Sequence, residues 1–160
     1  MSGENRIRIM LKSGKDQSVR RFHPWVFSGA IKKVYGGEPA EGDVVEVIDN
    51  KNEFLALGHY QVGSIAIRLF TFDDVEPDYN FWYNKILSAF KLREETGLVG
   101  SAETNVYRLF HAEGDGIPGL IIDYYNGHAV LQIHSIGVYQ IRKWIVEILQ
   151  EIYGEELKSV

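Results

Sequence analysis

The segment HAEGDGIPGLIID, residues 111–123, holds the side chains whose types could most directly do chemistry. They are one imidazole and three carboxylates: His111, Glu113, Asp115 and Asp123. Imidazole nitrogens and carboxylate oxygens bind Mg²⁺ or Mn²⁺, so a metal-dependent hydrolase is one interpretation of this cluster. Two of the carboxylates could act as general acid and base only if their pKa values were well separated.

A structural role for the same loop is the interpretation that we favour. Its glycines permit positive φ angles, and Asp115 could accept hydrogen bonds from nearby amides, in which case Asp115→Asn should cost little stability. The glycines also match GxGxxG, but they precede a strand rather than a helix, so no dinucleotide site is expected. We predict a rigid loop, structural or facing a substrate, without a metal ion. Its candidate substrate-facing residues are Arg108, Glu113, Asp115 and Gly116.

A second cluster, RRFHPWVFSGAIKKV at residues 20–34, sets cations beside aromatic rings. Cations neutralise phosphates and flat rings stack on exposed bases, which is typical of a nucleic-acid interface. Rings are also ordinary core material, and we expect Trp25 and Phe27 to lie in the core. His23 precedes Pro24, so its backbone should be extended, and its ring could stack on a base or close the turn. The residues predicted to contact RNA are Lys12, Lys15, Arg20, Arg21, His23, Lys32 and Lys33.

Charge is distributed unevenly around a net value of −5. Residues 5–35 carry eight Lys and Arg side chains and one acidic side chain. Residues 36–160 carry nine Lys and Arg side chains and twenty acidic ones. The basic end should attract polyanions, and the acidic remainder should repel them. Solvated lysine faces are common, so charge alone leaves nucleic-acid binding and a bare surface equally open.

Several functional classes are excluded by composition. The sequence contains no cysteine, which rules out a disulfide framework, a thiolate metal site and a cysteine nucleophile within this chain. No stretch approaches the roughly 20 apolar residues of a membrane span, and the opening MSGENRIRIM is unlike a secretory leader. We therefore expect a cytoplasmic location and no membrane partner.

The first seventy residues or so predict a small β-rich unit. Strands are expected at residues 6–11, 44–49, 54–60 and 64–72, where apolar side chains alternate or recur between turn signals. Pro24 is suited to the first turn of a short helix carrying residues 25–30. The acidic segment at 73–78 is the predicted domain boundary.

Beyond residue 78 the apolar pattern takes the period of a helix, which Gly97 should end. Strands are expected at 105–112, 120–125 and 129–134, the last two joined by the type I′ turn signal Asn126-Gly127. A second helix is predicted from residue 138 to 153, followed by the start of a strand at 157–160. A helix followed by a beginning strand is half of a βαβ unit, so we expect the chain to be part of a longer protein.

Three blocks, in this order, resemble one known family. They are HPWVFSGAI at residues 23–31, EGDVVEVIDNKNEFLALGHY at 41–60 and YRLFHAEGDGIPGLIIDYYNGHAVLQ at 107–132. The family is that of the S-adenosylmethionine-dependent methyltransferases of cytosine C5 in large-subunit ribosomal RNA. The first and third blocks carry most of the resemblance, because barrel strands alone would be weak evidence.

The resemblance implies a PUA domain, a small central α/β domain and a C-terminal Rossmann-like domain that holds S-adenosylmethionine and a nucleophilic cysteine. Attack on cytosine requires a thiolate, so this chain would be the RNA-recognition portion and would neither bind S-adenosylmethionine nor catalyse alone. The expected α+β fold has a PUA-like β pseudo-barrel over residues 1–73 and a small α/β domain, two helices on a short sheet, over 76–160. The implied partner is large-subunit ribosomal RNA. A stand-alone RNA-binding module is the alternative.

Overall fold

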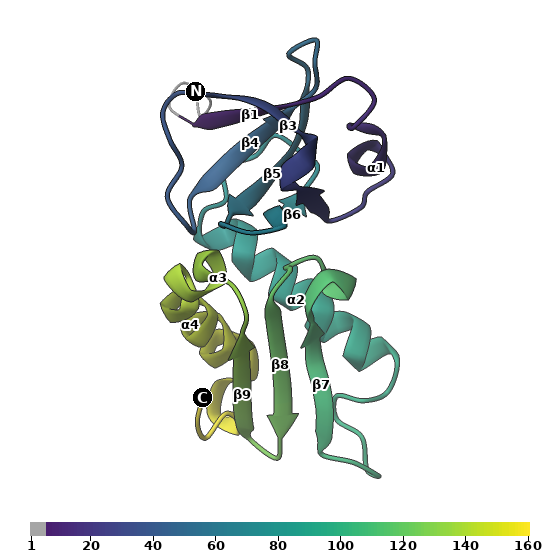
Figure 1. Ribbon diagram of the computed structural model, residues 1–160. Helices are drawn as coiled ribbons and strands as arrows, with labels where there is room; N and C mark the ends of the chain where they lie inside the picture. Colours follow the sequence, from purple (N-terminus) through teal and green to yellow (C-terminus); the bar gives the residue numbers. More distant parts are fainter. Residues whose placement is uncertain (1–5) are drawn as a thin grey trace. The chain divides into compact units, whose positions relative to one another are not determined.

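The computed structural model describes residues 6–160, so residues 1–5 of the predicted pseudo-barrel lie outside it. The chain divides into two compact units, of which the first runs to Glu76 and also includes Ser135–Gly137 (Figure 1). The second comprises Pro77–His134 and Val138–Val160. Within the described residues, no helix is both long enough and apolar enough to cross a membrane.

The first unit is built on a six-stranded sheet in the order β2-β6-β5-β4-β1-β3. The strands are β1 Ile7–Leu11, β2 Trp25–Phe27, β3 Ile31–Tyr35, β4 Val44–Ile48, β5 Phe54–Tyr60 and β6 Ile65–Thr71. Helix α1, Gln17–Arg20, precedes β2, and the 3-10 turn η1, Ser28–Ala30, follows it. Strands β1 and β4 pair in parallel, and the other neighbours pair antiparallel.

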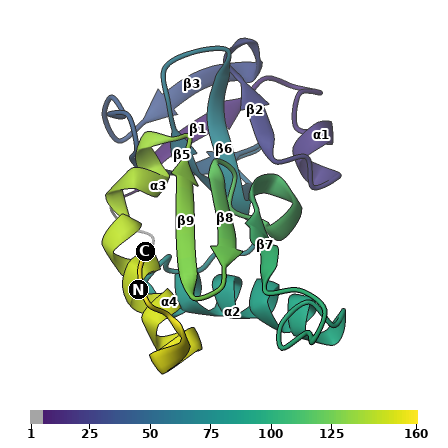
Figure 2. The ribbon, with the colours of Figure 1, turned by 90° about the horizontal axis from the view of Figure 1, so that it is seen from below.

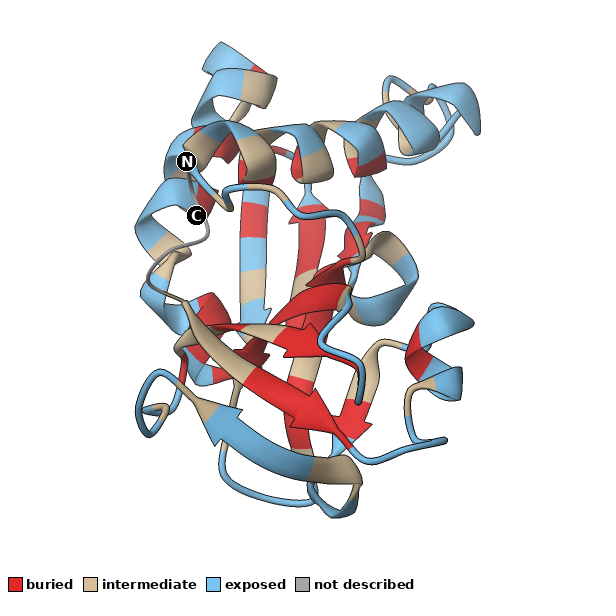
Figure 3. Ribbon diagram, turned by 90° about the horizontal axis from the view of Figure 1, so that it is seen from above, coloured by how far each residue is buried: buried red, intermediate tan, exposed pale blue. Residues whose placement is uncertain are grey.

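The alternation that predicted these strands places their apolar side chains on the inner face of the curled sheet. Figure 3 shows many buried residues along these strands. Ile9, Leu11, Val45, Val47 and Ile67 lie in this core with 0% of their surface exposed. Burying each such side chain contributes about 1.5–3 kcal/mol, so the inner face supplies most of the stability of this unit.

The short helix predicted for residues 25–30 is wrong over its first half, and only Ser28–Ala30 are helical, as the 3-10 turn η1. Trp25–Phe27 is instead the strand β2, which pairs with β6 through Trp25 opposite Arg68 and Val26 opposite Ile67. The strand continues the sheet because Val26, which is 2% exposed, joins the core while its neighbours point the other way. The prediction also missed α1 and β3.

Residues Ser135–Gly137 belong to the first unit and lie against His59 of β5. A Cβ atom added to Gly137 would overlap three atoms of the His59 ring. That ring is 4% exposed and packs on Phe70 with the ring centroids 4.8 Å apart, so it has little room to move. Glycine is therefore required at this close approach.

Gly137→Ala is expected to lower the free energy of unfolding by about 1–3 kcal/mol, because one added methyl group overpacks this site. Urea denaturation measures the change. Gly29→Ala is the matched control, since a Cβ atom at Gly29 meets no atom within 4 Å. Equal stability of the two variants would contradict the packing described here.

The second unit is a three-stranded antiparallel sheet in the order β7-β8-β9, with α2 and α4 on one face (Figure 1). Its elements are α2 Tyr79–Glu95, β7 Val106–His111, η2 Ala112–Asp115, β8 Leu120–Tyr125, β9 His128–Ile133, α4 Arg142–Tyr153 and η3 Gly154–Glu156. The buried side chains of the two long helices are Trp82, Ile86, Ala89, Ile145, Ile148, Leu149 and Tyr153. The predicted α+β class is confirmed.

The ends of α2 agree with the sequence signals. Asp78 caps its first turn, where the side-chain Oδ1 accepts a hydrogen bond from the backbone N of Phe81 at 2.9 Å. Gly97 follows the helix with a φ of 77°. The hairpin predicted between β8 and β9 is also present, with Asn126 and Gly127 at φ angles of 47° and 91°.

The second predicted helix is two helices. Helix α3, Ile136–Gln140, is separated from α4 by Ile141, and Arg142 donates a hydrogen bond from Nη1 to the Tyr139 carbonyl at 2.8 Å. That carbonyl is one of those left without a helical partner where α3 ends. The strand predicted to begin at residue 157 is seen as a single parallel bridge between Ser159 and His128.

Candidate nucleic-acid interface

The aromatic residues of the basic segment lie on the outer side of β2. Since side chains alternate along a strand, an inward Val26 places Trp25 and Phe27 on the opposite face. Phe27 is 49% exposed, and Trp25 is half-buried, so the prediction that both belong to the core is wrong for Phe27. A strand of three residues is too short for its alternation to show this from the sequence.

A hollow of about 330 Å³ opens between α1, β2 and η1, which lie side by side in Figures 1 and 2. Its lining residues are Lys15, Ser18, Val19, Trp25, Val26, Phe27, Gly29 and Ala30. Val19 and Val26 are 1% and 2% exposed and belong to the core behind the hollow. The exposed lining residues include the aromatic Phe27 and the cationic Lys15.

His23 and Phe22 precede β2 and contact aromatic rings of the first unit. The backbone N of Trp25 donates a hydrogen bond to His23 Nδ1 at 3.2 Å, so the ring does close the turn. The same ring lies edge-on to Trp25, with centroids 5.8 Å apart. Phe22 has a φ of 63°, and its ring is 70% exposed and lies edge-on to Phe72.

Two of the predicted cations lie beside the hollow. Lys15 lines it, and Lys12 donates a hydrogen bond from Nζ to the carbonyl of Gly29 at 2.8 Å. Both side chains are exposed, so their ammonium groups face water beside the hollow. This arrangement suits a ligand that combines a planar apolar ring with a negative charge.

Arg20 is placed differently from the other predicted cations. Its guanidinium donates to Asp16 Oδ2 and to Asp49 Oδ2, each at 2.7 Å, and lies 3.5 Å from Glu53. Asp49 is buried, and backbone hydrogen bonds, first that of Glu53 and then that of Lys51, lower the pKa of its carboxyl. Arg20 therefore pairs a buried carboxylate of the first unit, and its charge is already partly neutralised.

The remaining cations are exposed but do not line the hollow. Arg21 follows α1, and Lys32 and Lys33 lie on β3, the last strand of the sheet order. The Lys33 ammonium lies 4.7 Å from the centroid of the Tyr35 ring. Exposed cationic side chains of this kind suit phosphate contacts that carry no base specificity.

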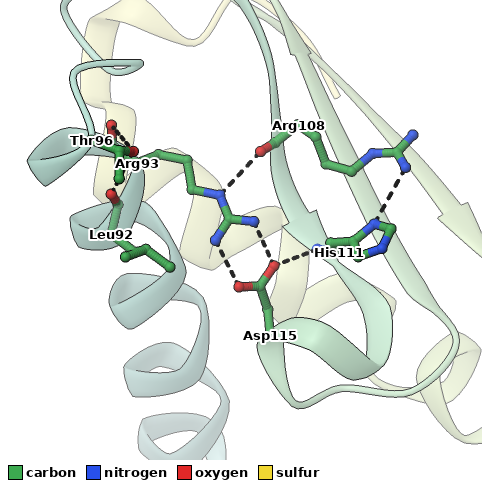
Figure 4. A network of polar contacts seen from close by, with 6 residues as sticks. All are labelled: Leu92, Arg93, Thr96, Arg108, His111 and Asp115. Atoms are coloured by element: carbon green, nitrogen blue, oxygen red, sulfur yellow. Dashed lines mark hydrogen bonds and ion pairs between the residues drawn. The ribbon is translucent and has the colours of Figure 1, made fainter.

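The loop after β7 is built around an internal ion pair (Figure 4). The Arg93 guanidinium donates to both oxygens of Asp115, at 2.6 and 2.7 Å, and the backbone N of His111 donates to Asp115 Oδ2 at 2.6 Å. Gly116 takes a left-handed conformation with a φ of 85°, and Lys85 Nζ donates to its carbonyl at 3.1 Å. The loop is therefore rigid, and Asp115 has both oxygens engaged.

Arg108 pairs elsewhere. Its guanidinium donates to the two oxygens of Asp123 on the neighbouring strand, at 2.8 and 3.1 Å. Arg93 and Arg108 thus each form an internal ion pair with one carboxylate. Across residues 6–160, no group of three or more His, Asp or Glu side chains is arranged to hold a metal ion.

Comparison with known families identifies the first unit. Residues 9–72 match the family model described as a PUA-like domain. This part of the chain has a PUA-like fold. The expectation of a PUA-like fold followed by a small α/β domain is thereby confirmed, and the hollow beside α1 lies on the PUA-like domain.

Related proteins extend the likeness to nearly the whole chain. The chain is 41% identical over 153 residues to ribosomal RNA large subunit methyltransferase I of Photobacterium profundum. The matched region covers 92% of this chain and 37% of the relative. A putative SAM-dependent methyltransferase from Streptococcus mutans has the same fold, with a TM-score of 0.80 at 22% identity over 95% of this chain and 39% of that chain. A solved structure of a putative methyltransferase complexed with SAH gives the same values. The chain thus spans a little over a third of these proteins.

Proposed function

We propose that this chain is the RNA-recognition portion of an S-adenosylmethionine-dependent methyltransferase of cytosine C5 in large-subunit ribosomal RNA. The observation that carries the proposal is the 41% identity over 153 residues to ribosomal RNA large subunit methyltransferase I. The PUA-like domain supports an RNA-docking role, as do its exposed cations and its aromatic hollow.

The two parts of the chain have separate tasks in this proposal. Residues 1–73 dock RNA, and residues 76–160 form the central domain that joins this surface to a catalytic domain. S-adenosylmethionine and the cysteine that attacks the base belong to that further domain, since this chain has no cysteine and matches 37% of its relative. The protein acts in the cytoplasm, on ribosomal RNA.

The loop with Glu113, Asp115 and Gly116, together with Arg108, faces the substrate in the same proposal. Its contribution is rigid positioning, because Asp115 is held by Arg93 and by the His111 amide. Full methylation by Glu113→Gln and Arg108→Gln variants of the whole enzyme would show that the loop does not contribute to the reaction.

RNA binding by this chain is expected to weaken with salt, because each neutralised phosphate releases counterions. Replacing Arg21, Lys32 and Lys33 by Ala should weaken binding and reduce the slope of log K against log salt by about 2. Fluorescence anisotropy with a labelled fragment of large-subunit ribosomal RNA measures both quantities. Arg20 is left intact because it pairs the buried Asp49.

The matched control removes three exposed lysines outside the basic segment: Lys51, Lys91 and Lys143. It changes the net charge by the same amount and should leave the slope unchanged. A slope that falls equally in both variants would show that overall charge, rather than this surface, directs binding. Absence of RNA binding by the intact chain would overturn the proposed function.

A further inference from the structure

We propose that a pocket of the second unit, between α2 and η2, binds one nucleotide of the RNA beside the loop that faces the substrate. This inference rests on the proposed RNA-recognition function and deepens it. It assigns a nucleotide subsite to the small α/β domain, in addition to the cations of the PUA-like domain.

The pocket is built from one helix face and one loop. Its volume is about 340 Å³, within the range of small-ligand sites, and its lining residues are Phe81, Asn84, Lys85, Ser88 and Asp115. The four residues of α2 recur at helical spacing, so they share one face of the helix, while Trp82, Ile86 and Ala89 are buried. Asp115, from η2, closes the other side.

The ammonium group of Lys85 is held where the helix meets the loop. Its Nζ donates a hydrogen bond to the Gly116 carbonyl at 3.1 Å and lies 5.5 Å from the centroid of the Phe81 ring. A cation within about 6 Å of an aromatic ring is attracted to its face. These contacts fix a positive charge beside a flat apolar ring. A nucleotide, which joins a negative phosphate to a flat base, matches this pair of groups.

The carboxylate in the wall of the pocket is already neutralised. Arg93 donates to both oxygens of Asp115, and the backbone N of His111 donates to one of them (Figure 4). Lys85, Arg93 and Asp115 together carry a net charge of +1. Residues 36–160 are acidic overall, but exposed charges more than about 10 Å away are largely screened at 0.1 M salt. The charges at the pocket therefore count most, and their sum favours a phosphate.

Two exposed polar side chains supply groups that pair with the edge of a base. The amide of Asn84 offers a donor and an acceptor side by side, the combination that reads base edges in nucleic-acid complexes. The Ser88 hydroxyl donates to the Asn84 carbonyl at 2.8 Å, so its oxygen remains an acceptor. An apolar segment of a protein would leave these groups unpaired on binding, which favours a nucleotide as the occupant.

Two substitutions change the pocket, and each has a matched control on α2. Asn84→Leu fills the pocket and removes the amide at an exposed position, where leucine is a good helix former. Asn80→Leu makes the same change outside the pocket. Lys85→Ala removes the ammonium group, and Lys91→Ala removes an exposed lysine outside the pocket. Melting temperatures from circular dichroism check that each variant is folded, and Asn84→Leu keeps the test valid if Lys85→Ala disturbs the loop.

The test titrates the nitrogen-15-labelled chain with the four ribonucleoside 5′-monophosphates and with ribose 5-phosphate, followed by NMR. For at least one nucleotide, the backbone amide signals of Asn84, Lys85, Ser88 and Gly116 should shift and saturate. Ribose 5-phosphate, which lacks the base, should bind roughly 10-fold more weakly, the scale of base stacking on an aromatic ring. Asn84→Leu and Lys85→Ala should each weaken nucleotide binding by roughly 10-fold, and the two controls should match the wild type.

The outcomes separate the subsite from the proposed function, because RNA binding by the same chain is measured independently by anisotropy. Shifts confined to the PUA-like domain, or no response to any nucleotide, would overturn the subsite and leave RNA docking intact. Equal binding of ribose 5-phosphate would also overturn it, since the pocket would then hold a phosphate alone. Shifts in the pocket of a chain that does not bind RNA would uphold the subsite and overturn the proposed function.

Discussion

Asp115→Asn is expected to lower the free energy of unfolding by about 3–5 kcal/mol, the cost of removing one partner of a buried ion pair. The side chains of Arg93 and Asp115 are only 13% and 8% exposed. A neutral amide would leave the guanidinium charge of Arg93 uncompensated in a place that water reaches poorly. From sequence, a small cost was expected only if Asp115 served the turn alone. Because Asp115 also pairs with Arg93, we expect the larger cost.

The neighbouring ion pair of Arg108 with Asp123 provides a matched control. It is also bidentate, but Arg108 is 43% exposed, so water can replace the lost carboxylate. Asp123→Asn should therefore cost about 1 kcal/mol or less. Urea denaturation followed by far-ultraviolet circular dichroism compares the two variants. Equal costs would show that burial of the arginine is not what makes the Asp115 pair strong.

A double variant tests whether the cost of Asp115→Asn is the unpaired charge. Arg93→Met removes the guanidinium and keeps a flexible apolar side chain of similar length. Combined with Asp115→Asn, it should be less destabilised than the two single variants added together, by about 1–3 kcal/mol. Simple additivity would mean that the two side chains contribute to stability separately.

Much of the fold was predictable because its signals are local. Alternating apolar residues gave β1, β4, β5 and β6, and their inner-facing side chains are the core of the PUA-like domain. The helical period, the Asp78 cap and the Gly97 stop gave α2. Each of these elements has enough apolar residues at the spacing of a strand or a helix to favour that structure by itself.

The elements that were missed are short and depend on distant partners. Three residues of β2 cannot show a period, and they form a strand because β6, some forty residues later in the chain, supplies their hydrogen bonds. The four residues of α1 are likewise too few to form a helix alone. Strand β3 lies at the end of the sheet order beside β1 and buries little, so its side chains show no clear alternation.

The candidate site was predictable in kind but not in geometry. Composition predicted that the basic segment near the N-terminus binds a polyanion. Exposed cations and an exposed aromatic ring do lie on that segment. The hollow is assembled from three elements, two of which the sequence did not predict. Arg20 is distinguished from Arg21 by Asp49, a buried carboxylate 29 residues away that no local pattern connects to it.

His59 is expected to make the stability of the first unit depend on pH below neutrality. The ring is 4% exposed, and burial lowers its pKa to about 4 from the ordinary value of 6.5. Between these two values the unfolded chain binds a proton at His59 that the folded chain excludes. Stability should therefore be complete above pH 6.5 and fall as the pH decreases, by about 3 kcal/mol in total by pH 4.

The contribution of His59 is isolated by comparing slopes rather than absolute stabilities. Glu46 acts in the opposite direction, because burial raises the pKa of its carboxyl, and Asp49, whose pKa is lowered, loses its contribution at still lower pH. The free energy of unfolding measured in urea from pH 7.5 to 4 should thus fall less steeply in His59→Phe and His59→Asn than in the wild type. These two variants replace the ring by an apolar one and by a neutral amide, so their absolute stabilities will differ while both lose the proton site. Wild-type and variant curves that run parallel through this range would show that His59 binds its proton equally in the folded and unfolded chains. That result would contradict a pKa lowered by burial of the ring.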